Sequence, residues 1–177
     1  MTAYDTDKLA QLHAASVKAI GPVAKGRSLE DLVEYAFVQL PSVTLFQRDV
    51  GDGAGSQEID LIFSHFPHKS NIPIQDVTIL VECKNERKKT SAPQIYVLAS
   101  KLHSRSLPIG VLVTAAGVSG KRSTAGHGAI RDSLAQGQAI IVVLANELAS
   151  MESHMELQEL LTNRLMELRT FREYRSV

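Results

Sequence analysis

The chain has 177 residues, enough for one domain with a proper hydrophobic core. Nineteen basic residues balance nineteen acidic ones, so a nucleic-acid-binding surface, if there is one, must be a local patch. The single cysteine excludes an internal disulfide and a cysteine-rich zinc site, which fits a cytoplasmic location. The sequence shows no signal peptide and no apolar run of the roughly 20 residues that a membrane span needs, so we expect no membrane association.

The first half of the chain reads as two helices followed by three strands. Helical spacing predicts a helix over residues 6–20, which Gly21 and Pro22 end, and a second helix that begins at Ser28 as N-cap and stops at Pro41. Strands are expected over residues 43–47, 58–63 and 77–84, with a turn at 51–56 and a loop at 64–75. The first two strands should form an antiparallel hairpin.

The second half alternates between helices and strands. We expect a helix over 92–105, a strand over 109–114, a helix over 124–136, a strand over 139–145 and a long last helix, about 146–174, capped by Asn146. Such alternation indicates parallel strands with crossover helices. The predicted fold is α/β, a central mixed five-stranded sheet flanked by helices, in a single domain over 1–177 with a core of about 25–145.

Charged residues lie in two of the predicted strands. Side chains alternate along a strand, so Glu82 and Lys84 share one face, and Val81 and Cys83 share the other. Asp60 has a similar setting in the upstream strand. A carboxylate or an ammonium at the end of a buried strand costs free energy unless it is paired or binds a metal. Asp60 with Glu82-x-Lys84 is typical of a metal-dependent phosphodiesterase.

The chemistry of such a site follows from its residues. Phosphodiester hydrolysis needs a neutralised phosphate and a deprotonated water, and Mg²⁺ (or Mn²⁺) accepts oxygen ligands. Asp60 and Glu82 would supply carboxylates, and the main-chain carbonyl of Cys83 a third ligand. Lys84, close to a cation, should have a lowered pKa and would orient or deprotonate the water, or stabilise charge in the transition state.

These segments, in this order, resemble the PD-(D/E)-x-K nuclease superfamily, particularly its Mrr-like restriction endonuclease branch. The resemblance runs from about Lys25 to about Ala145 and rests on Lys25-Gly26-Arg27-Ser28-Leu29-Glu30, Glu58-Ile59-Asp60-Leu61-Ile62, Val81-Glu82-Cys83-Lys84-Asn85 and Ile109-Gly110-Val111-Leu112-Val113-Thr114. It implies a restriction-endonuclease-like core and a Mg²⁺-dependent endonuclease acting on DNA, of restriction or defence type. It also implies a catalytic role for Glu30 beside Asp60, Glu82 and Lys84.

Several of these assignments have a plainer alternative. Glu82 and Lys84 could be a surface ion pair, which contributes little. Glu30 could be an acid favoured by the helix dipole in a first turn, and Glu34 is a rival for its role. Gln94 could lie near the attacking water, but we favour a capping box in which it reaches back to Ser91.

The sequence also suggests binding partners. Lys88, Lys89, Lys121 and Arg122 are candidates for contacts with the DNA backbone, although basic runs are usually solvated loops. The apolar residues of the last helix and the need to cut two strands favour a homodimer. No target-recognition domain is evident, so a protein partner could supply recognition. The alternatives to a DNA endonuclease are an inactive nucleic-acid-binding or assembly module on a nuclease fold and an RNA- or junction-specific nuclease.

Overall fold

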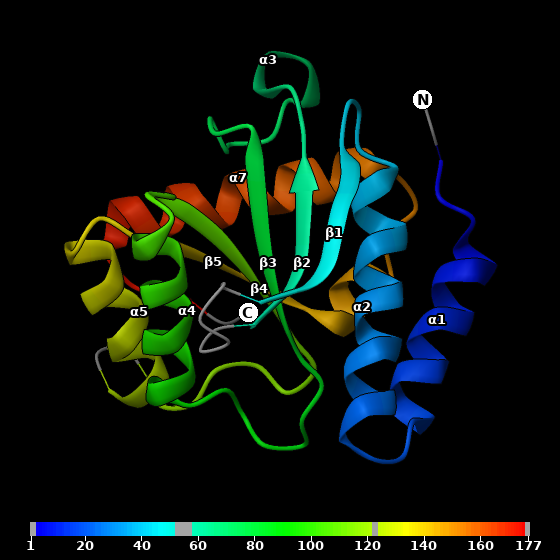
Figure 1. Ribbon diagram of the computed structural model, residues 1–177, viewed down its shortest axis with the longest axis horizontal. Coiled ribbons are helices and arrows are strands. Elements are labelled where there is room, and N and C mark those ends of the chain that lie inside the picture. The colour runs from blue at the N-terminus through cyan, green and yellow to red at the C-terminus, as the bar shows by residue number, and fades with distance from the viewer. Residues whose placement is uncertain (1–2, 52–57, 122–123, 176–177) are drawn as a thin grey trace.

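The computed structural model describes residues 3–51, 58–121 and 124–175 (Figure 1). Its elements in chain order are α1 (Thr6–Lys18), α2 (Pro22–Val38), β1 (Thr44–Gly51), β2 (Glu58–Ser64), α3 (Pro67–Ser70), β3 (Thr78–Lys84), α4 (Ala92–Ser104), β4 (Ile109–Thr114), α5 (Ala125–Ala135), β5 (Ala139–Leu144), α6 (Ala145–Ala149) and α7 (His154–Phe171). The predicted five strands are all present, and the α/β class is confirmed. In the described part of the chain, no helix is both long and apolar enough to cross a membrane.

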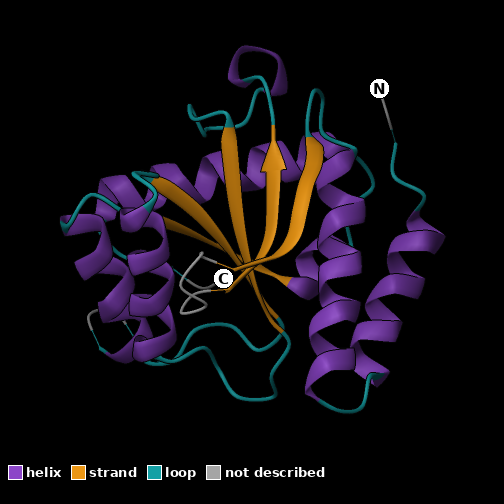
Figure 2. Cartoon of the chain, in the orientation of Figure 1, coloured by secondary structure: helices purple, strands orange, loops and turns teal. Residues whose placement is uncertain are grey.

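The five strands form one mixed sheet in the order β1-β2-β3-β4-β5 (Figure 2). β1, β2 and β3 are antiparallel neighbours, and β3, β4 and β5 run parallel. This confirms the expected hairpin and crossover pattern. β3 is therefore the central strand and is paired on both sides, which makes its carboxyl end the place where the antiparallel and parallel halves of the sheet meet.

Helices α2 and α4 cover opposite faces of this sheet. Phe37 of α2 stacks on Phe63 of β2 at 5.2 Å between ring centroids. On the other face, a Cβ added to Gly110 of β4 would lie 2.7 Å from the Leu102 side chain of α4. Gly110 is thus the residue that lets α4 approach the sheet closely, and the residues next to Leu102 come within reach of β3.

The second helix begins earlier than predicted. α2 starts at Pro22, not after Ser28, and the Ser28 hydroxyl donates to the carbonyl of Lys25 from inside the helix. Gly21 has φ +88°, and proline is well suited to the first helical position because its φ is preset and its missing N–H has no helical partner there. Glu30 therefore lies in the middle of α2, and the helix-dipole explanation for this acid no longer applies.

The predicted long last helix is two helices. α6 ends with Ser150 as its C-cap, and α7 begins after Ser153, whose N–H and hydroxyl both donate to Glu156 in a capping box. Asn146 lies inside α6 and does not cap it. Four leucines of α7 are buried over the sheet, beside β5: Leu157, Leu161, Leu165 and Leu168. Because one chain already uses this apolar face, the face no longer argues for a dimer.

Candidate active site

The candidate site lies where the pairing between β2 and β3 stops. The last paired residues are Leu61 of β2 and Val81 of β3. Beyond them, the Cys83 N–H donates to the side chain of Asp60, at 2.6 Å from Oδ2, and not to a main-chain carbonyl. On the other side of β3, the Lys84 carbonyl accepts from the Ala115 N–H at 3.0 Å. Neighbouring residues of a strand direct their main-chain polar groups to opposite sides. The Cys83 carbonyl therefore faces the side on which Asp60 lies.

Glu82 is held between two lysines on the face of the sheet that α4 covers. Its Oε1 accepts from Lys84 Nζ at 2.7 Å and its Oε2 from Lys101 Nζ at 2.6 Å. Glu82 and Lys101 are only 4% and 5% exposed. The Lys101 pair is consequently shielded from solvent, whereas the Lys84 side chain, 23% exposed, reaches the surface. Glu82 and Lys84 are therefore not an ordinary surface ion pair.

The pKa values of Asp60 and Lys84 are both raised in the site. Burial, followed by the nearby charge of Glu82, raises the pKa of Asp60 to about 6, although the Cys83 N–H and the two lysines oppose the shift. Burial alone would lower the pKa of Lys84, but the charges of Glu82 and Asp60 outweigh it, and the pKa of Lys84 is raised. The sequence analysis predicted a lowered pKa for Lys84, because it assumed a cation beside this lysine. In the chain itself, the neighbouring carboxylates set the direction of the pKa shift.

The raised pKa of Asp60 predicts how stability changes with pH. Between about pH 4 and pH 6 the folded chain holds a proton on Asp60 that the unfolded chain releases, so the free energy of unfolding falls as pH rises through this window. Asp60→Asn should remove this loss and stabilise the protein at about pH 8 by up to about 3 kcal/mol. Urea titrations in EDTA at about pH 4 and pH 8 would measure it. An equal effect at both pH values would contradict the assignment.

The oxygen atoms of the site suit a hard divalent cation. Glu82 is close enough to Asp60 for its charge to raise the pKa of Asp60, and the Cys83 carbonyl lies on the side of Asp60. Two carboxylates and a carbonyl match the ligand preferences of Mg²⁺ and Mn²⁺. Within residues 3–51, 58–121 and 124–175, no group of three or more His, Cys, Asp or Glu side chains is arranged to hold a metal.

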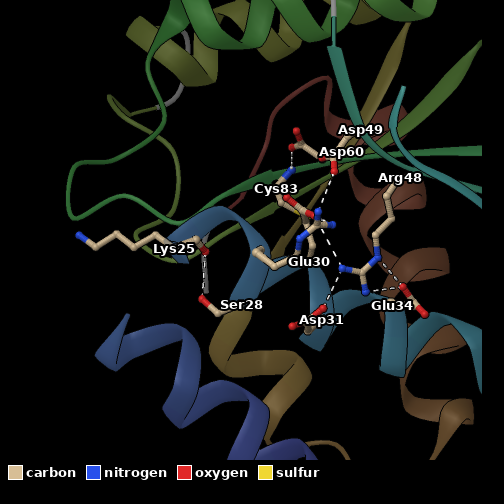
Figure 3. Close-up of polar contacts among 10 residues, drawn as sticks. Lys25, Ser28, Glu30, Asp31, Glu34, Arg48, Asp49, Asp60 and Cys83 are labelled. Carbon is tan, nitrogen blue, oxygen red and sulfur yellow. Dashed lines mark hydrogen bonds and ion pairs between the residues drawn. The ribbon is translucent and has the colours of Figure 1, made fainter. Parts of the chain in front are cut away.

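Arg48 of β1 binds the acidic side of α2 (Figure 3). Its Nε donates to Glu34 Oε2 and its Nη1 to Asp31 Oδ1, each at 2.7 Å, and Nη1 lies 3.8 Å from Glu30 Oε2. Glu34, the rival candidate, is thus engaged with this arginine. The contacts fix the edge strand of the hairpin to α2, which holds the hairpin in place beside the candidate site.

Glu30 lies close to Asp60 but pairs with arginines, not with Lys84. Arg27 Nη1 donates to Glu30 Oε2 at 3.3 Å, and Arg27 Nη2 lies 3.1 Å from Asp49 Oδ2. Burial raises the pKa of Glu30, and the charges of Asp49 and Asp60 raise it further. Glu30 is therefore placed to act on Asp60 electrostatically.

A basic cavity adjoins the end of β3. It has a volume of about 550 Å³ and is lined by Lys84, Cys83 and the start of α2, with Lys25, Arg87 and Lys88 at its walls. Of the predicted backbone contacts, Lys88 lies in this cavity, whereas Lys89 and Lys121 line a separate one of about 820 Å³. Arg122 lies outside the described residues.

Gln94 forms the capping box that the sequence favoured. Its Oε1 accepts from the N–H and the hydroxyl of Ser91, both at 2.9 Å, and its Nε2 donates to Glu86 at 2.8 Å. Gln94 therefore organises the first turn of α4 and the loop after β3.

Two residues of the site were missed by sequence reasoning. Lys101 could have been found, because it lies three residues after Leu98 and one before Leu102, on the inward side of α4. Asn85 carries no such signal. Its Nδ2 donates to the carbonyls of Ser16 and Lys25, at 2.9 and 2.8 Å.

A mixed five-stranded sheet with an antiparallel hairpin, an acid in the second strand of that hairpin and Glu-x-Lys at the end of the central strand defines the restriction-endonuclease-like class of folds. Residues 24–151 match the family model of the Mrr catalytic domain, described as a restriction endonuclease. The match covers most of the chain, so the protein belongs to this family, as the resemblance implied. A search of curated proteins gives no match.

Proposed function

We propose that this protein is a Mg²⁺-dependent endonuclease that hydrolyses phosphodiester bonds in DNA, of restriction or defence type. The observation that carries the proposal is the meeting of Asp60, Glu82 and Lys84 at the end of β3, beside a basic cavity. Membership of a restriction endonuclease family supports nuclease chemistry. We assign the activity to one domain over 1–177 and place it in the cytoplasm.

In the proposed site, Asp60, Glu82 and the Cys83 carbonyl would hold the cation. A bound divalent cation neutralises charge on the phosphate and lowers the pKa of a bound water. Lys101 keeps Oε2 of Glu82, since it is buried, while the more exposed Lys84 is free to turn from Oε1 toward substrate. Because its pKa is raised, Lys84 acts as an ammonium that orients water and stabilises negative charge.

The groups around the centre have supporting roles in this proposal. Glu30, held by Arg27, stands at the rim, where it would bind a water of the cation. Lys88 contacts the phosphate backbone from the cavity wall, and Lys89 and Lys121 contact it from the second cavity. Cutting both strands needs two centres or one that reorients, so we propose a homodimer, with target recognition from loops or a protein partner.

One observation favours a second candidate function. Both oxygens of Glu82 are already paired with lysines, so the charge of this acid is balanced without a cation. An inactive nucleic-acid-binding or assembly module could retain such a triad for its fold alone. The two functions differ in turnover. Incubating the pure protein with duplex, single-stranded and branched DNA and with RNA, in Mg²⁺ or Mn²⁺, separates them and identifies the substrate.

Metal binding gives an independent prediction. Asp60→Ala should abolish the calorimetric signal of Mg²⁺ or Mn²⁺ while the protein stays folded, because losing the hydrogen bond from the Cys83 N–H should cost about 1–3 kcal/mol. Glu82→Ala should also lose the metal, but it strands the buried Lys101, so Glu82→Gln with Lys101→Met is the better variant. Arg131→Ala, at an exposed pair remote from the site, serves as control. Undiminished binding in both site variants would refute the metal assignment.

A further inference from the structure

The corner between α1 and α2 exposes a group of apolar side chains. Ile20 is 90% exposed, Val23 86% and Val17 69%. They lie on both sides of the turn at Gly21, where φ is +88° and the chain reverses into Pro22. Exposed apolar residues grouped in this way mark contact surfaces more often than isolated ones do.

This corner is fixed to the end of the central strand. Asn85 directly follows Lys84, and its side-chain amide donates to the carbonyl of Ser16 near the end of α1 and to that of Lys25 in the first turn of α2. The turn between α1 and α2 and the loop after β3 lie at the same end of the molecule (Figure 1). The position of Ile20 is therefore set relative to Lys84.

The surroundings of the corner are basic. Two cavities of about 550 Å³ each share Lys25, Asn85 and Arg87. One of them contains Lys84 and Lys88, and the other contains Lys18 and Ile20. Glu86, the one acid among the described residues that line them, accepts a hydrogen bond from Gln94. A continuous basic surface thus runs from the candidate active site to the exposed apolar corner.

We propose that the α1–α2 corner is a contact surface for duplex DNA, with Ile20 packed into the minor groove and Lys18 and Arg87 on flanking phosphates. The proposal rests on the proposed nuclease function and adds a substrate-positioning element to it. Apolar side chains that enter a groove beside phosphate-binding lysines are a recurrent means of nucleic-acid binding. Ile20 and all of α1 precede residues 24–151, the part of the chain that the family model matches.

Basic charge favours DNA over a protein partner at this corner. An apolar patch alone would suit either, but five cations and one acid line the adjoining cavities, and these cavities lead to Lys84. A phosphate backbone is the partner that complements such a surface.

The test separates apolar from ionic contacts by their salt dependence. Binding of the full chain to a short labelled duplex is measured by fluorescence anisotropy in EDTA at several salt concentrations. Ile20→Ser should weaken binding about tenfold without changing the slope of log Kd against log salt. Lys18→Ala should reduce that slope by about 1. Met166→Ser, at a residue of α7 that is 62% exposed, should bind like the wild type.

Two results would overturn the inference. If Ile20→Ser binds duplex as tightly as Met166→Ser, the corner is not a DNA contact, and loss of self-association in the same variant would assign it to a second copy of the chain. If the wild type itself binds no duplex, the proposed function fails and takes this inference with it. The high exposure of Ile20 means that the serine variant should fold normally, which circular dichroism checks.

Discussion

Lys84→Ala should remove cleavage and retain DNA binding. A positioned proton-transfer or charge-stabilising group typically contributes about 10²–10⁴-fold to a rate, and Lys84 is the cation closest to Oε1 of Glu82. Binding should persist because it depends on several phosphate contacts, of which Lys84 would be one. A cleavage time course beside a gel-shift titration measures the two effects separately.

Lys84→Arg tests what this lysine supplies. Arginine keeps the charge, but its planar fork replaces a compact ammonium and does not fit a point-charge role. We expect it to recover little activity. Lys88→Ala, in the same cavity, is the matched control and should alter affinity more than rate. Cleavage by Lys84→Ala at the wild-type rate would make the binding-module interpretation the better one.

Lys101→Met should destabilise the folded protein by roughly 3–5 kcal/mol, toward the lower end because Lys84 still pairs with Glu82. Removing one member of a buried ion pair leaves the other without its partner in a poorly solvated place. Urea unfolding in EDTA measures the change, and Lys88→Met, on the exposed loop after β3, controls for the loss of a lysine.

A double-mutant cycle identifies the cause of that loss. If loss of the ion pair causes the destabilisation, the double variant Lys101→Met with Glu82→Gln should lose clearly less free energy of unfolding than the two single variants lose in sum. Additive costs would show that Lys101 stabilises α4 by packing alone, and its assignment as the counter-ion of Glu82 would be withdrawn.

The sequence predicted the parts of the site that depend on local pattern. The apolar run before Glu82-x-Lys84 located the central strand, and the same alternation located Asp60 in β2. Parallel pairing of β3, β4 and β5 followed from the alternation of strands and helices. These features need only spacing within a few residues, which is the information that a single sequence carries well.

Contacts between distant segments were not predictable in the same way. Arg48 reaches α2 across 14 to 18 positions, and Asn85 reaches Ser16 across 69, and no periodicity relates such pairs. The start of α2 was misplaced because Gly21 and Pro22 were taken as the end of one helix and not as the beginning of the next. The break before α7 was missed because the leucine pattern continues through it, while Ser153 bridges to Ala3 at the other end of the chain.

The pairing of Glu82 with Lys101 affects whether the chain can fold before it binds a metal ion. Many small metalloproteins cannot fold without their ion, because the free energy of metal binding supplies their folding free energy. Here a lysine from α4 already balances the buried acid, so newly made chains should reach their final shape in a metal-poor environment. Chelator treatment should then leave the protein folded but without its proposed nuclease activity, and adding the cation back should restore that activity. The cation supply would control the activity and not the stability of the fold.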